Sequence, residues 1–127
     1  MNLYFIDSNI LVYANDQNAG NKQIRAIDVV KSCMKLQNGV ISIQVLQEYA
    51  NIAFRKLGQD ITVVLRQLKL FEILRIIVPS PKMVRHTVEI QHSYKVSFWD
   101  AGIIAAAEES NSDCILSEDL NPGQFYA

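Results

Sequence analysis

Leu3-Tyr4-Phe5-Ile6-Asp7-Ser8-Asn9 is the stretch that decides the fold, because it joins an apolar run to an acid and two capping residues. The run is short, continuous and without helical spacing, which is typical of a strand covered on both faces in a parallel sheet. Asp7 then stands at the carboxyl end of that strand, and Ser8 and Asn9 are residue types that begin helices. We therefore expect a strand over residues 3–6 and a short helix over residues 10–14.

The rest of the chain alternates helical periodicity with short apolar runs. Further helices are expected at 22–37, 44–57, 61–74, 81–94 and 98–110, and further strands at 40–43, 75–78 and 114–117. Gly39 and Gly58 are expected to end helices, while Asp60, Ser80 and Ser97 are expected to cap helix starts. This alternation predicts an α/β fold with three α/β/α layers, in which helices cover both faces of a mainly parallel sheet of four to five strands.

Composition restricts the classes of function. The chain has 127 residues, 50% hydrophobic and 20% charged, which indicates one folded domain over residues 1–127. A formal net charge of −1 gives no general attraction for polyanions, so any nucleic-acid binding must come from local groups. No apolar run reaches the ~18 residues that span a bilayer. The N-terminus has no leader pattern either, so we expect a cytoplasmic protein. Cys33 and Cys114 lack metal or redox spacing and are expected to be buried free thiols.

Several acids are expected at the carboxyl ends of strands, where α/β sheets place their functional groups. Asp7 follows the first strand, Glu118 and Asp119 follow the last, and Asp100 lies in the first turn of a helix. Each acid taken singly has a structural explanation, as a turn former, a helix-dipole partner or a loop residue. Together in one cleft they would repel one another unless a cation neutralised them, and oxygen ligands favour Mg²⁺ or Mn²⁺.

Other residues keep two interpretations at this level. By spacing alone, Glu48 either faces the same edge of the sheet or is a solvated charge. Trp99 and Phe98 are candidates for stacking on bases, with core packing as the alternative for at least one of them. The cations available for RNA contact, each more often a solvated helix charge, are Lys22, Arg25, Lys82, Arg85 and Lys95. His86 and His92 are interpreted as incidental.

Four segments in order along the chain carry a resemblance to a known family. They are Phe5-Ile6-Asp7-Ser8-Asn9-Ile10-Leu11-Val12-Tyr13-Ala14, Gln47-Glu48-Tyr49, Ser97-Phe98-Trp99-Asp100-Ala101 with Ile103, Ala105 and Ala106, and Leu116-Ser117-Glu118-Asp119-Leu120 with Gly123-Gln124. These segments resemble the PIN-domain family, and specifically its VapC-like toxin ribonucleases. They extend from residue 5 to residue 124, and the third and fourth are the most specific.

The resemblance implies a metal-dependent ribonuclease of a type II toxin–antitoxin pair. Asp7, Glu48, Asp100 and Asp119 would form its catalytic centre and hold Mg²⁺ or Mn²⁺, with Ser8 and Glu118 in support. It further implies an RNA substrate, a cognate antitoxin protein and a homodimer, for which the apolar helical surface around residues 44–74 is the candidate interface. Relatives usually continue into another short strand near an Asn-Pro-Phe sequence, so a final strand is expected to be absent or truncated here.

Two other classes of function remain open on the sequence. One is a PIN-like protein-interaction module with little catalysis, against which four intact acids argue. The other is a structure-selective DNA nuclease, which would use the same metal centre. A phosphate-transfer receiver domain needs adjacent carboxylates after the first strand, and Asp7-Ser8-Asn9 lacks them.

Overall fold

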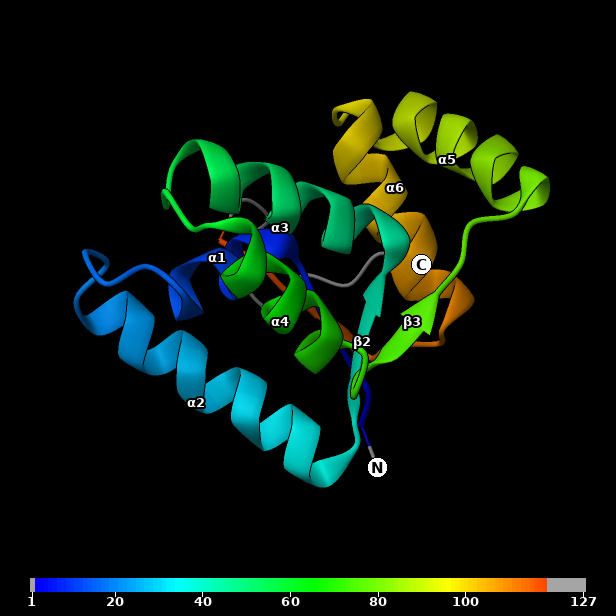
Figure 1. Ribbon diagram of the computed structural model, residues 1–127. Helices are drawn as coiled ribbons and strands as arrows, with labels where there is room; N and C mark the ends of the chain where they lie inside the picture. Colours follow the sequence, from blue (N-terminus) through cyan, green and yellow to red (C-terminus); the bar gives the residue numbers. More distant parts are fainter. Residues whose placement is uncertain (1, 119–127) are drawn as a thin grey trace.

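Four parallel strands form the central sheet of the computed structural model, which describes residues 2–118. The strands are β1 (Tyr4–Ile6), β2 (Gly39–Ser42), β3 (Arg75–Ile77) and β4 (Cys114–Leu116), and their order across the sheet is β3-β2-β1-β4 (Figure 1). In the central register, Phe5 of β1 lies between Val40 of β2 and Ile115 of β4. The predicted parallel α/β sheet is confirmed, and its first and last predicted strands are neighbours.

Helices cover both faces of this sheet, as expected for three layers (Figure 1). One face carries α1 (Ser8–Ala14), α2 (Asn21–Leu36), α3 (Ile43–Arg55) and α4 (Ile61–Phe71), and the other carries α5 (Pro81–Tyr94) and α6 (Phe98–Glu109). All residues from Ala101 to Ala107 are buried, because α6 lies between the sheet and α5. A helix that is apolar on every side needs such a position.

Side-chain caps fix where most of these helices begin. Ser42, Asp60, Ser80 and Ser97 each accept a hydrogen bond from a backbone N–H in the first turn of α3, α4, α5 and α6. The caps predicted at Asp60, Ser80 and Ser97 are confirmed. The first helix begins at Ser8, two residues earlier than expected, because Asp7 itself is the cap. These five helix starts are therefore tied to the end of the preceding strand or loop, whereas α2 has no side-chain cap.

Gly39 was expected to end a helix, and this prediction is wrong. The helix α2 ends at Leu36, and Gln37 takes the left-handed conformation of the cap with φ 56°. Gly39 instead begins β2, where an added Cβ would lie 2.7 Å from Leu74 Cδ2 and 2.8 Å from Cys33 Cβ. Glycine is required at this position by close packing against two side chains.

Two further helix and strand boundaries differ from the prediction, and the two cysteines differ from each other in burial. Ile43 belongs to α3 rather than to the second strand, and α4 ends at Phe71 rather than near Leu74. Both cysteines are free, but only Cys33 is buried, and burial raises the pKa of its thiol. Cys114 is partly exposed. Within residues 2–118 no helix is both long and apolar enough to cross a bilayer.

Candidate active site

Asp7 is held at the carboxyl edge of the sheet by hydrogen bonds from both sides. It is only 5% exposed, and its Oδ1 accepts a hydrogen bond of 2.7 Å from the backbone N–H of Ser8. Its Oδ2 accepts one of 2.7 Å from Ser117 Oγ, which β4 brings to this point by pairing with β1. Asn9 Nδ2 in turn donates to Ser117 Oγ at 3.2 Å. A buried carboxylate with several donors has one fixed orientation.

Glu48 faces Asp7 from α3, which decides between the two interpretations that the sequence left open. Ser8 Oγ lies 3.0 Å from Glu48 Oε1 and 3.4 Å from Asp7 Oδ1. A hydroxyl has one proton, so the shorter contact makes Glu48 its main acceptor. Gln44 Nε2 donates to Glu48 Oε2 at 3.3 Å and to the carbonyl oxygen of Trp99 at 3.0 Å. Glu48 is thereby connected both to α1 and to α6.

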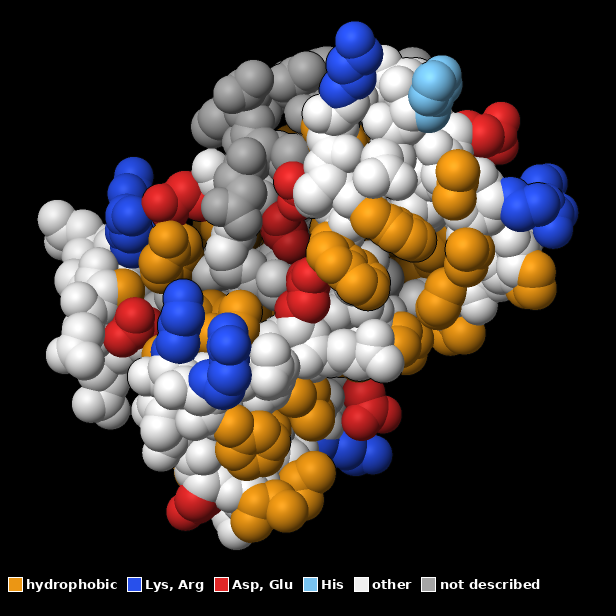
Figure 2. All heavy atoms as spheres, turned by 90° about the horizontal axis from the view of Figure 1, so that it is seen from above, with side chains coloured by type: hydrophobic (Ala, Val, Ile, Leu, Met, Phe, Trp, Pro, Cys, Tyr) orange, Lys and Arg blue, Asp and Glu red, His pale blue; other side chains and the backbone are white. Residues whose placement is uncertain are grey.

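Asp100 reaches the same place from the other face of the sheet. Its backbone N–H donates to Ser97 Oγ at 3.1 Å, which places it in the first turn of α6, where the helix dipole favours a carboxylate. A cleft of about 310 Å³ is lined by Asp7, Ser8, Glu48, Asn51, Ile52, Arg55, Asp100 and Ile103. Figure 2 looks onto this edge of the sheet, where acidic side chains surround a hollow. Three of the four acids expected at the centre share this cleft.

Asp119, the fourth expected acid, lies outside the described residues. Glu118 lines a neighbouring cavity of about 270 Å³ with Tyr13, Lys22 and Arg25 instead of the acidic cleft. Its Oε1 pairs with Lys22 Nζ at 2.9 Å. The hydrogen bonds from Lys22 and Tyr13 lower the pKa of the Glu118 carboxyl. The supporting role expected for Glu118 stays a prediction.

Three cleft or near-cleft residues were missed by the sequence interpretation. Arg55 and Asn51 line the cleft, and Gln44 holds Glu48. A signal for all three was present, since they lie seven and three residues after Glu48 and four residues before it, on the same helical face. Ser117, which holds Asp7, had no signal of this kind because its position depends on strand pairing.

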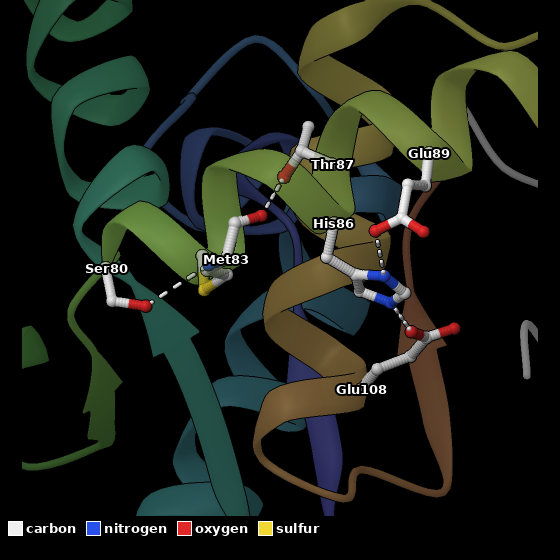
Figure 3. Close-up of polar contacts among 6 residues, drawn as sticks. All are labelled: Ser80, Met83, His86, Thr87, Glu89 and Glu108. Atoms are coloured by element: carbon white, nitrogen blue, oxygen red, sulfur yellow. Dashed lines mark hydrogen bonds and ion pairs between the residues drawn. The ribbon is translucent and has the colours of Figure 1, made fainter.

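The other candidate cations and His86 lie on α5 or at its end, away from the acidic cleft. Lys82 and Arg85 line a cavity on α5, apart from the acids, and Lys95 is the C-cap of α5. His86, on the same helix, lies between Glu89 and Glu108 (Figure 3). The hydrogen bond to Glu108 raises the pKa of His86, against the opposing effect of burial. The contact with Glu108 joins α5 to α6 outside the acidic cleft.

The cleft offers the oxygen ligands of a hard cation. Its polar lining consists of three carboxylates, the Ser8 hydroxyl, the Asn51 amide and Arg55, and neither His nor Cys takes part. Carboxylate and hydroxyl oxygens suit Mg²⁺ or Mn²⁺ better than Zn²⁺. Within residues 2–118 no three His, Cys, Asp or Glu side chains form a preassembled metal site. The acids thus share a cleft without yet converging on one point.

The same fold occurs in solved structures. VapC20 of Mycobacterium tuberculosis, described as a sarcin-ricin loop cleaving toxin, matches with a TM-score of 0.72 and 18% identity, covering 91% of both chains. VapBC2 of Rickettsia felis, solved with a DNA fragment from their promoter, gives 0.67 and 19% over 94% of this chain and 89% of that one. PAE2754 of Pyrobaculum aerophilum gives 0.65 and 16% over 93% and 75%. At these identities the likeness concerns the fold.

Comparison of the sequence with individual curated proteins and comparison with family models give different results. No curated protein matches the chain at a significant level. The family model described as PIN domain matches residues 4–126, which is nearly the whole chain. With the parallel sheet and the acidic cleft at its carboxyl edge, this match shows that the chain belongs to the PIN domain family.

Proposed function

We propose that this chain is an endoribonuclease that hydrolyses RNA phosphodiester bonds with a divalent metal ion, as the toxin of a type II toxin–antitoxin pair. Members of the PIN domain family are nucleases, which supports the hydrolase part of the proposal. VapC20 and VapBC2 among the structural neighbours support the assignment to a toxin–antitoxin pair. The observation that carries it is the shared cleft of Asp7, Glu48 and Asp100.

The donor set fits Mg²⁺ or Mn²⁺, which Asp7, Glu48 and Asp100 would hold, with Asp119 proposed as a fourth ligand. When bound, such an ion supplies Lewis acidity to the phosphate and activates water for attack. The chain's own contribution is orientation of the acids. Ser117 and the Ser8 backbone fix the Asp7 carboxylate, while the Ser8 hydroxyl and Gln44 direct Glu48 into the cleft.

Arg55 is the proposed phosphate contact of this site. It is exposed, lines the cleft and stands two helical turns after Glu48 on α3. A guanidinium forms paired hydrogen bonds with phosphate oxygens, so it can place the RNA backbone beside the acids. This local cation matters because the net charge of −1 provides no general attraction for RNA.

The same proposal includes an antitoxin partner, a homodimer and cytoplasmic residence. The candidate dimer surface keeps exposed apolar side chains on α3 and α4, of which Phe54, Ile61 and Leu65 are 49%, 64% and 58% exposed. Burying them against a second copy would remove apolar area from water. Light scattering at micromolar concentration should then give twice the mass of the chain.

Cleavage of single-stranded RNA tests the enzymatic proposal. Wild-type protein should cleave with MgCl₂ or MnCl₂ and stop in excess EDTA, because the acids need a cation before phosphate can approach. Asp100→Asn should lower the rate by at least about a hundredfold. Asp28→Asn, the same chemical change at an exposed position on α2, is the matched control and should retain wild-type activity.

Several outcomes would contradict this proposal. Cleavage in excess EDTA, or equal rates for the two Asn variants, would remove the acidic cleft from the reaction. Cleavage of DNA with RNA left intact would assign a structure-selective DNA nuclease. A folded protein that cleaves neither substrate would instead be a protein-interaction module.

A further inference from the structure

A second cavity lies beside the acidic cleft, where the first turns of α3 and α6 meet α5. Its volume is about 180 Å³, and its lining includes Gln44, Gln47, Met83, Val84, Phe98 and Trp99. Two side-chain amides therefore stand beside aromatic and aliphatic groups. By comparison, a cavity of roughly 150 Å³ holds a benzene molecule in a protein core. This cavity has room for one flat ring of similar size.

Trp99 presents an aromatic surface to this cavity. Its ring stacks on Phe98, with centroids 5.3 Å apart and planes 8° from parallel, yet the residue is 65% exposed. Because one face of the indole is covered by Phe98, the exposure belongs mainly to the opposite face and the edges. A large ring left in water is costly unless a ligand covers it. The pair forms a ready platform for a planar ligand.

The cavity is connected to the acidic cleft through Gln44. Gln44 lines the cavity while its Nε2 donates to Glu48 Oε2 and to the Trp99 carbonyl oxygen. Trp99 is also the direct chain neighbour of Asp100. Gly102 leaves room for this connection, since a Cβ there would lie 2.5 Å from Gln44 Oε1. A ligand that spans the two hollows would pass over Gln44.

We propose that this cavity binds one unpaired base of the RNA substrate, next to the phosphate held at the acids. The inference rests on the proposed nuclease function and names the part of the substrate that its site recognises. Stacking on aromatic side chains and hydrogen bonding to amides are the interactions by which proteins bind splayed single-stranded bases. The exposed Gln47 amide can exchange its hydrogen bonds with water for hydrogen bonds to a base edge, which a purely aliphatic partner cannot offer.

Trp99 is the sole tryptophan of the chain, so its fluorescence reports on this cavity alone. The probes are short 2′-O-methyl oligonucleotides, which resist cleavage, and abasic oligomers of equal charge. We expect the base-bearing probes to quench Trp99 emission and the abasic probes to leave it unchanged. By anisotropy of a labelled probe, Trp99→Ala should weaken binding by roughly tenfold. Gln47→Ala should change the preference among bases.

Tyr94→Ala is the matched control, because it removes another exposed aromatic ring, on α5 but outside the cavity lining, and should bind the probe as wild type does. Equal quenching by abasic and base-bearing probes would overturn the proposal. An emission shift with protein concentration alone, insensitive to oligonucleotides, would make the cavity an interface between copies and also overturn it. If Trp99→Ala does not fold, the wild-type quenching experiment still decides.

The two proposals fail separately. RNA cleavage without base-dependent quenching would refute the base site and leave the nuclease function standing. Base-dependent quenching without any cleavage would support the base site and refute the nuclease function.

Discussion

The two walls of the acidic cleft are built differently. The strand-side wall comprises Asp7 and Ser8 with Ser117 in support, and the helix-side wall comprises Glu48 and Asp100 with Gln44 in support. In the first wall a buried carboxylate is fixed by donors from α1 and from Ser117, the residue that follows β4. In the second wall the side chains are partly exposed, and Gln44 connects Glu48 to α6.

This difference assigns different tasks to the walls. A buried acid whose donors come from two elements keeps one geometry, which suits a group that must hold a charge in place. Partly exposed side chains joined through one amide can adjust to the ligand that they meet. The strand-side wall should therefore control stability, and the helix-side wall should control substrate positioning.

The largest effect is expected from Ser117→Ala in the strand-side wall. The change removes a donor from the buried Asp7 carboxylate and should lower the free energy of unfolding by about 1–3 kcal/mol. Urea unfolding curves measure this loss. Ser93→Ala, at an exposed position of α5, is the control and should stay within ~0.5 kcal/mol of wild type. Equal stability of the two variants would contradict the rigid wall.

Gly102→Ala tests the helix-side wall. The added methyl group would meet only the far end of the Gln44 side chain, which can move, and alanine favours the helix. Stability should hardly change, while displacement of Gln44 from Glu48 should slow RNA cleavage by on the order of tenfold. Gln44→Ala, which removes the amide and leaves Gly102 unchanged, should slow RNA cleavage to a similar extent. A Gly102→Ala enzyme with full activity would show that Gln44 does not position Glu48.

A smaller effect is expected at the cavity beside the strand-side wall. Lys22→Ala should weaken RNA binding a few-fold. It should also reduce by about one the slope of the logarithm of the binding constant against the logarithm of the salt concentration. Glu118→Gln should strengthen binding, because it releases the Lys22 ammonium from its ion pair. Filter binding at several salt concentrations measures both. Lys31→Ala, at another exposed lysine of α2, is the control. A change in RNA affinity of the same sign for Lys22→Ala and Glu118→Gln would refute this assignment.

The smallest effect concerns His86, which joins α5 to α6 behind the helix-side wall (Figure 3). The hydrogen bond to Glu108 raises the pKa of His86 above its unfolded value of 6.5. The protonated pair therefore gives its full stabilisation of the fold at pH values below 6.5. This contribution is lost as pH rises through the raised pKa. His86 is 45% exposed, so solvent screening limits the effect to less than ~1 kcal/mol.

The measurement is the melting temperature of wild type against His86→Gln at pH 6 and pH 9. The difference should favour wild type at pH 6 and shrink at pH 9. Ser93→Ala, which changes an exposed side chain of the same helix that does not titrate, should differ from wild type equally at both pH values. A wild-type advantage that grows toward pH 9 would have the wrong sign for this pair.

Local patterns were sufficient for the architecture and for the positions of two acids. Strand ends and helix caps are encoded by neighbouring residues, so Asp7 and Asp100 could be placed at one edge of the sheet before any coordinates. Glu48 could not, because its direction depends on Ser8, forty positions away. Only the family resemblance selected it.

Gly39 shows why the remaining features escaped prediction. A glycine after a helix usually marks its left-handed cap, and here Gln37 takes that conformation. The actual requirement for glycine comes from Cys33 Cβ on α2 and from Leu74, which lies thirty-five positions after Gly39. Ser117 is similar, since its contact with Asp7 exists only once β4 has paired with β1. Long-range packing leaves no local signal.

The pairing of β1 with β4 also sets the order in which a newly made chain can finish its cleft. Translation produces Asp7 110 positions before it produces Ser117. Domains fold as their segments emerge, and β1 has no β4 partner until then. A nascent chain thus contains the acid long before it contains the strand that fixes it. The cell that makes this protein therefore meets the completed cleft only after Ser117 has emerged and β4 has paired with β1.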